Sequence, residues 1–269
     1  MNRRSLLTAA VAAAGSATAL PLVADTKSVG AASPWTRNSL GKILYIGDDG
    51  KERGREWFSF TYREDQQVTL RAYCEIDDTR VERDVVQTMT AQFHPLDCFV
   101  RLHVQGKFLG TGWIRVSEKE AECQVFSTVM GRVHQVVPLA EPATSLVSHP
   151  LSTDSLLLAK FDHSKPERTQ SWGGGLSTSP LADGGSGPFL SVGGLRSTEY
   201  VGPEKIRTRA GAFDTHHYRL IIGPRADGTP RSYDIWCTHP DYIFVQGEVR
   251  GYLQNKTGFG RYELVEFET

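Results

Sequence analysis

Apolar and polar residues alternate at every second position through most of this chain from residue 40 onward. In QVTLRAYCEID (67–77), Leu70, Cys74 and Ile76 fall on one side of an extended strand, and charged residues fall on the other. Successive side chains of a β-strand point to opposite faces, so the pattern predicts strands that are buried on one side. The same alternation is found in DCFVRLHVQG. A hairpin with a polar turn at residues 117–120 is indicated by FLGTGWIRVSEKEAECQVFSTV.

Helical periodicity is confined to LSTDSLLLAKFDH, where Ser152 or Thr153 would cap one short helix. The stretch from about residue 163 to 203 is rich in Gly, Ser and Pro, which indicates a long loop, either a lid over the sheet or a surface excursion. Short strands joined by tight turns are typical of antiparallel meanders. We therefore predict an all-β fold: a strongly curved antiparallel meander or open barrel with one short helix and a long Gly-rich loop.

The amino-terminal sequence has the pattern of an export signal. The paired arginines of MNRRSLL precede an Ala-rich apolar run with small residues behind it, as in a twin-arginine signal. Cleavage would follow Ala24 or Ala32. We expect residues 1–32 to be the signal peptide and leader, and residues 33–269 to be a single β-barrel-like domain. This domain would be periplasmic, and since no later stretch reaches the length of a membrane span, no transmembrane anchor would remain after cleavage.

The charge balance argues against polyanionic partners. The formal net charge is −1, so we expect neither a nucleic acid nor an anionic membrane surface as a partner. The four cysteines show no CxxC spacing, which disfavours a structural zinc site. We interpret them as small buried apolar residues and leave disulfides open as the alternative. They are Cys74, Cys98, Cys123 and Cys237.

The last third of the chain carries several phrases in a fixed order. RAGAF at residues 209–213 is followed by Trp236, by HPDY at residues 239–242 and by a closing YELVEFE. Together they resemble the PAGxF…W…HPDY…YELVEFE region of a family of exported bacterial β-sheet or open-barrel proteins of unknown function. The resemblance implies a curved antiparallel sheet and an envelope location. It supplies no catalytic residues.

AGAFDTHHYRL (210–220) concentrates chemistry-bearing side chains in one predicted strand. If its hairpin with residues 232–238 turns near residues 226 and 227, His216 pairs with Cys237 and Asp214 pairs with His239. Alternation then places His217 on the opposite face, near Trp236. A slip of one residue would separate the set, so the grouping depends on register. The residues gathered on one face would be Asp214, His216, Tyr218, Cys237 and His239.

Three chemistries fit this face. His216 or His239 would act as general base, oriented by Asp214, with Tyr218 as acid or oxyanion donor. A metal alternative uses Asp214, His216, Cys237 and His239 as ligands. A thiolate of Cys237 beside a histidine would be a nucleophile. The histidines would otherwise be ordinary strand residues, satisfied by their neighbours.

Aromatic residues supply candidate binding positions. Tyr242 and Phe244 lie on the otherwise polar side of the strand that begins at Tyr242, as expected for a sheet with a partly apolar inner surface. His149 would lie at the mouth of the sheet, under the Gly-rich loop that carries Trp172. We expect the substrate-binding set to be Trp236, Tyr242, Phe244, His149 and Trp172.

These observations favour an exported β-barrel enzyme that acts on a small, aromatic or apolar organic molecule. It would use acid–base chemistry, by isomerisation, elimination or hydrolysis, with no organic cofactor and no metal. The alternatives are a non-catalytic periplasmic ligand carrier, which would use the same cavity without chemistry, and a structural protein of the envelope.

Overall fold

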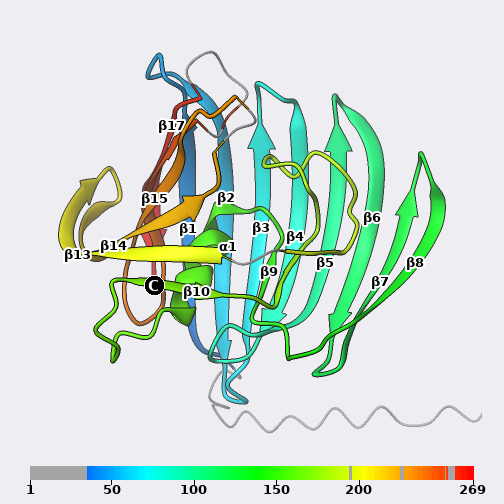
Figure 1. Ribbon diagram of the computed structural model, residues 1–269. Coiled ribbons are helices and arrows are strands. Elements are labelled where there is room, and N and C mark those ends of the chain that lie inside the picture. The colour runs from blue at the N-terminus through cyan, green and yellow to red at the C-terminus, as the bar shows by residue number, and fades with distance from the viewer. Residues whose placement is uncertain (1–34, 194–195, 225–226, 252, 254–257) are drawn as a thin grey trace, which may run out of the picture. The chain divides into compact units, whose positions relative to one another are not determined.

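The structure, a computed structural model, describes residues 35–193, 196–224, 227–251, 253 and 258–269. The predicted export signal lies outside these residues. Those described are mostly in β-strands (Figure 1). Among them, no helix has the length and apolar character needed to cross a membrane.

A 14-stranded sheet dominates the described part of the chain (Figure 1). Its neighbours are antiparallel throughout, in the order β10-β13-β14-β15-β16-β17-β1 and then β2 to β8. Tyr45 of β1 pairs with Tyr262 of β17, so the last strand of the chain joins the first. The edge strands β8 and β10 do not pair with each other, and the sheet is therefore open. This confirms the predicted all-β, open-barrel class.

The bounds of these strands follow the sequence. They are β1 (Trp35–Ile46), β2 (Glu52–Arg63), β3 (Val68–Ile76), β4 (Val81–Met89), β5 (Pro95–Val104), β6 (Lys107–Val116), β7 (Glu120–Ser127), β8 (Gly131–Pro138), β10 (Thr169–Trp172), β13 (Arg196–Thr208), β14 (Gly211–Ile222), β15 (Arg231–Cys237), β16 (Phe244–Arg250) and β17 (Gly260–Glu268). The turn predicted at residues 117–120 falls between β6 and β7.

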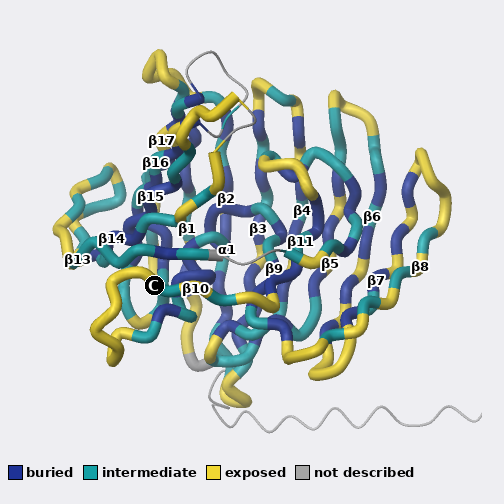
Figure 2. Tube along the Cα trace, viewed as in Figure 1, coloured by how far each residue is buried: buried dark blue, intermediate teal, exposed yellow. Residues whose placement is uncertain are grey.

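Burial alternates along the strands, as the sequence predicts (Figure 2). In β3, Leu70 and Cys74 are buried while Arg71 between them is exposed. The buried side, called the inner face below, carries the main apolar core, including Phe60 and Leu70. Each such side chain stabilises the fold by about 1.5–3 kcal/mol. The outer face holds the polar half of the alternation.

The Gly-rich segment covers part of the inner face. It contains three short strands among its turns: β10, β11 (Gly175–Ser177) and β12 (Ser191–Val192). The predicted end of the loop near residue 203 is wrong, because the long strand β13 begins at Arg196. β11 and β12 form a small sheet with β9 (Ser145–Val147). Leu176 and Leu190 are buried in one apolar cluster with Val85 and Ile114 of the large sheet. The segment is therefore a packed cover, broken into short strands.

One short helix also lies against the inner face. α1 (Leu151–Asp154) continues as the 3₁₀ helix η1 (Ser155–Lys160). The predicted N-caps are wrong, because Ser152 and Thr153 lie inside α1 and no side chain of the preceding residue caps it.

A carboxylate of the sheet takes the place of the missing cap. Glu56 of β2 is fully buried and accepts hydrogen bonds from the backbone N–H of Leu151 at 2.6 Å and of Ser152 at 3.0 Å. The first amides of a helix have no partner within the helix, so a carboxylate there satisfies them. The hydroxyl of Tyr45 donates to the same carboxylate at 2.9 Å.

All four cysteines are buried and free. Burial raises the pKa of each thiol, that of Cys123 to about 11. This agrees with the interpretation of the cysteines as small buried apolar residues. It also disfavours a reactive thiolate at Cys237, because the thiolate is the nucleophilic form.

We predict that Glu56→Ala destabilises the protein by about 3 kcal/mol, because it leaves two buried backbone amides and the Tyr45 hydroxyl without their acceptor. Urea unfolding measures the loss. The same substitution at Glu82, an exposed position on β4, is the control and should change stability by less than about 0.5 kcal/mol. Equal effects at the two positions would contradict the anchoring role of Glu56.

Candidate functional site

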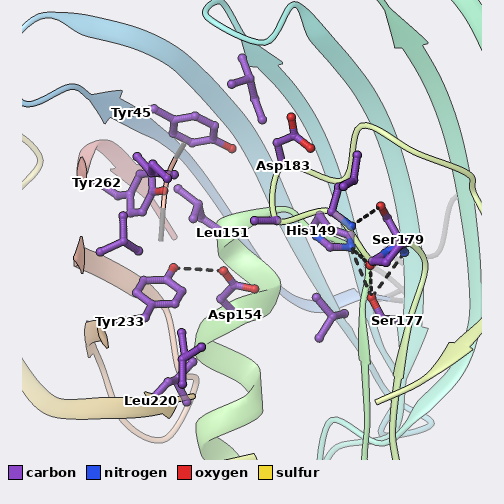
Figure 3. Close-up of a pocket in the computed structure, with 18 of the residues that line it drawn as sticks. Tyr45, His149, Leu151, Asp154, Ser177, Ser179, Asp183, Leu220, Tyr233 and Tyr262 are labelled. Atoms are coloured by element: carbon purple, nitrogen blue, oxygen red, sulfur yellow. Dashed lines mark hydrogen bonds between the residues drawn. The ribbon is translucent and has the colours of Figure 1, made fainter. Parts of the chain in front are cut away.

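A cavity of about 780 Å³ lies on the inner face, beside α1 (Figure 3). Its lining residues come from strands of the large sheet, among them β1, β2, β14, β15, β16 and β17, and from α1 and residues 177–183 of the Gly-rich segment. Figure 3 shows Tyr233 and Tyr262 on one side of α1, and His149 and Ser179 on the other. We call this space the inner-face cavity.

Tyrosines and charged groups form the polar wall of the cavity. Tyr262 meets Tyr45 edge-to-face, with ring centroids 5.4 Å apart, and meets Tyr233 at 6.2 Å. Arg53 donates to the Tyr262 hydroxyl at 3.2 Å. The Tyr233 hydroxyl donates to Asp154 of α1 at 3.0 Å. These groups can both donate and accept hydrogen bonds at one end of a ligand.

His149 lies on the opposite wall, in the left-handed region at φ 78°. Its Nε2 donates to the Ser179 carbonyl at 3.2 Å. Burial, together with the positive charge of Arg83, lowers the pKa of His149 to about 3. The imidazole is therefore neutral at physiological pH.

Apolar side chains complete the lining. Leu151 and Leu157 come from the helical segment, Leu220 from β14 and Val249 from β16. The cavity thus combines an apolar floor with polar groups at its ends. Pockets that bind small organic molecules have this composition.

A second group of side chains lies elsewhere on the inner face. Tyr218 is fully buried, and its hydroxyl is 2.7 Å from His163 Nε2 and 2.9 Å from His239 Nε2. The Tyr200 hydroxyl is 2.7 Å from His216 Nδ1. The rings of His216 and His239 stack at 3.7 Å, with 7° between their planes. We call these five residues the imidazole–tyrosine cluster.

The cluster holds its imidazoles neutral. Burial, followed by the charges of His216 and His163, lowers the pKa of His239 to about 4. Burial also lowers the pKa of His163 and of His216, and it raises the pKa of Tyr218. A tyrosine hydroxyl carries one proton, so Tyr218 donates to one imidazole and accepts from the other. The arrangement can pass a proton between His163 and His239.

The strand register decides which predicted residues meet here. His216 pairs with Cys237, as predicted. Asp214 does not pair with His239, because β15 ends at Cys237. Asp214 instead forms an ion pair with Lys205 of β13 at 3.2 Å, with its side chain 84% exposed. Asp214 therefore does not orient a histidine of the cluster.

The predicted metal ligands are not brought together either. Asp214 is turned to solvent, and Cys237 is fully buried as a thiol whose pKa burial raises. Across the described residues, no group of three or more His, Cys, Asp or Glu side chains is arranged to hold a metal ion.

The predicted binding residues separate into different places. His149 lines the inner-face cavity. Tyr242 lies beside the cluster, with its ring centroid 4.6 Å from that of His239. Phe244 is 1% exposed and belongs to the core, so it is not available to a ligand. Trp172 in β10 packs against the same core and does not line the cavity.

Trp236 is on the outer face, away from both groups. It stacks on His217 at 4.1 Å and donates to Glu204 at 2.7 Å. His217 Nε2 lies 2.8 Å from Asp234, which also accepts a hydrogen bond from Arg219 at 2.9 Å. Burial acts to raise the pKa of Asp234, but the hydrogen bonds from His217 and Arg219 outweigh it and the pKa is lowered. Asp234 and His217 are thus packed together on the outer face.

Several site residues were not predicted from the sequence. His163 and Tyr200 complete the cluster, and the tyrosines and Arg53 form the cavity wall. Tyr200 could have been found from its pairing with Tyr218 across β13 and β14. His163 follows the helical segment, and no local pattern connects it to the strands.

Comparison with models of known protein families gives no match, and comparison with curated proteins gives none either. Solved structures do match. A β-barrel-like protein of the domain of unknown function DUF1849 from Brucella abortus is 9% identical, with 86% of this chain and 96% of that chain covered and a TM-score of 0.52. At this identity the similarity shows the fold alone.

Two further structures are similar over much of their length. A DUF1089 family protein from Pseudomonas aeruginosa is 8% identical, with 74% of this chain and 91% of that chain covered and a TM-score of 0.42. A Bacteroides fragilis protein, provisionally described as exported and with a YmcC-like fold, is 14% identical. It covers 88% of this chain and 98% of its own, with a TM-score of 0.31.

We predict that stability falls with pH below about 6.5 in part through His149. Its pKa is about 3 in the folded chain and near the ordinary 6.5 when unfolded, so between these values the unfolded chain binds a proton that the folded chain does not. His149→Asn removes this titration and tolerates the positive φ. In urea unfolding from about pH 7 to pH 4, the slope of the variant should be smaller by up to about 1.4 kcal/mol per pH unit. Parallel curves for the two proteins would contradict the assignment.

Proposed function

We propose that this protein binds a small organic molecule in the inner-face cavity and acts as an exported ligand carrier. The observation that carries the proposal is the cavity itself. Its volume of about 780 Å³ is within the range of about 300–1,000 Å³ that small-molecule sites occupy. A purely structural sheet would instead fill its inner face with side chains.

The lining favours an amphipathic ligand, with an apolar or aromatic body. Leu157, Leu220 and Val249 offer apolar surface to that body. At the polar end, Arg53, Asp154 and Tyr262 line the cavity and offer donors and acceptors to the polar part of a ligand.

The proposed compartment is the periplasm, reached by a twin-arginine signal. The paired arginines and the Ala-rich run that follows them support it. The RAGAF…W…HPDY…YELVEFE phrases point the same way, through their resemblance to exported bacterial β proteins.

Narrowing the cavity tests the proposal. Leu220→Trp adds a ring to the apolar lining, so we expect it to weaken binding of the aromatic dye 1-anilinonaphthalene-8-sulfonate about tenfold. Dye fluorescence measures the dissociation constant. Leu40→Trp is the matched control, because Leu40 does not line the cavity and is 50% exposed. Equal affinities for Leu220→Trp and the unaltered protein would place the dye elsewhere and defeat the proposal.

Acid–base catalysis at the imidazole–tyrosine cluster is the second candidate function. The observation that favours it is the convergence of two imidazoles on one tyrosine hydroxyl. His239, neutral at physiological pH, would act as the general base, and Tyr218 would act as the acid or oxyanion donor. His216 stacks on His239 and limits the movement of its ring. No organic cofactor enters this chemistry.

The pH dependence of hydrolysis checks this second function, with p-nitrophenyl acetate as the probe. Since the base must be neutral and the pKa of His239 is about 4, kcat/KM should stay level from about pH 8 to pH 5 and fall below that. His239→Gln should lower kcat/KM about 100-fold. His103→Gln on the outer face of β5 serves as the control. Hydrolysis that survives His239→Gln would exclude His239 as the base.

A further inference from the structure

A groove of about 580 Å³ crosses the outer face of β5 to β8. These strands lie far along the sheet from β13 to β17 (Figure 1). Phe99, Trp113 and Phe126 line it, on three adjacent strands. Trp113 is 41% exposed and Phe126 is 51% exposed. A group of exposed aromatic side chains of this kind marks an interaction site on a folded protein.

The pairing of the strands arranges polar groups beside these rings. Trp113 pairs with Gln124, and Gln124 pairs with His134. Phe126 pairs with Arg132. Cross-strand partners lie about 5 Å apart on the same face. An aromatic floor on β5 to β7 therefore meets a polar border on β7 and β8.

Glu122 positions that polar border. Its Oε1 lies 3.0 Å from His134 Nε2 and accepts a hydrogen bond from Gln124 at 3.0 Å. Its Oε2 accepts from Arg115 at 3.3 Å. The hydrogen bonds from Gln124 and His134 also lower the pKa of Glu122. Side chains held in place before binding lose less conformational entropy when a ligand arrives.

We propose that this outer groove binds a neutral saccharide chain. The C–H faces of pyranose rings pack on aromatic rings, and their hydroxyl groups both donate and accept hydrogen bonds. Trp113 and Phe126 supply the aromatic surface, and Gln124, Arg132 and His134 supply polar partners. Of the residues that line the groove, Arg132 alone carries a fixed charge, and its guanidinium can donate hydrogen bonds to the hydroxyl oxygens of a sugar.

The composition of the groove separates a saccharide from other occupants. A membrane-binding face is apolar, whereas polar side chains border these rings. Four of its ten lining residues have polar side chains, unlike the dry apolar centre of a stable dimer interface. The site is on the opposite face of the sheet from the inner-face cavity and is independent of the function proposed for that cavity.

Isothermal titration calorimetry with cellohexaose, chitohexaose and maltohexaose tests the proposal. At least one of them should bind with a dissociation constant below about 10 mM. Trp113→Ala should weaken that binding about tenfold or more, because it removes the central ring. Trp113→Phe should keep affinity within about threefold, which guards against loss of fold as the cause. Glu122→Ala should weaken it by a smaller factor, about three- to fivefold, through loss of positioning.

Trp57→Ala is the matched control. Trp57 is also exposed and aromatic, stacks on Tyr73 at 5.8 Å, and lies outside the groove. It should leave saccharide binding unchanged. Failure of all three saccharides to bind at about 10 mM overturns the proposal, as does equal weakening by Trp57→Ala and Trp113→Ala. A dimer in sedimentation velocity that Trp113→Ala abolishes would overturn it in favour of a second copy of the chain.

Discussion

The backbone amides of Leu151 and Ser152 donate hydrogen bonds to Glu56. These two bonds attach the segment that covers the inner face to the sheet. An open sheet has no opposite wall, so its apolar side must be covered by other parts of the chain. Glu56 attaches that cover at its most polar point, the start of α1, and does so from a fully buried position. A buried carboxylate is costly unless it is hydrogen-bonded, so this attachment holds the helix in one place on the sheet.

The same helical segment builds both candidate sites. Asp154, near its start, lines the inner-face cavity and accepts from Tyr233. Phe161, just past its end, packs on Tyr200 and Tyr218 with ring centroids 5.8 Å from each. His163 follows two residues later and reaches Tyr218. The start of this segment therefore lines the inner-face cavity, and the residues just past its end pack in the imidazole–tyrosine cluster.

Period-two alternation was enough to predict the strands and one key register. The turn residues between β14 and β15 gave the pairing of His216 with Cys237, which the structure confirms. The same extrapolation failed at Asp214, because the chain leaves the strand after Cys237: Thr238 bonds back to Ile243, and His239 turns toward Tyr218. Alternation describes a strand but carries no information about where it stops. The burial of Glu56 could have been predicted from the sequence. Glu56 lies two and four residues from Phe58 and Phe60 on the same strand, so all three side chains point to the buried face.

The adjacent pair His216 and His217 shows how one strand gives two histidines opposite electrostatic surroundings. His217 faces outward, where its Nε2 lies 2.8 Å from the carboxylate of Asp234. His216 faces inward, where its partners are a tyrosine and another imidazole, and burial lowers its pKa. A general base must be free of its proton at the working pH, and the inward histidines meet that condition. The proposed acid–base chemistry of this hairpin therefore rests on imidazoles without a carboxylate partner, because Asp214, which the sequence placed beside His216, pairs with Lys205 instead. The Asp–His contact that does form, between Asp234 and His217, is on the outer face.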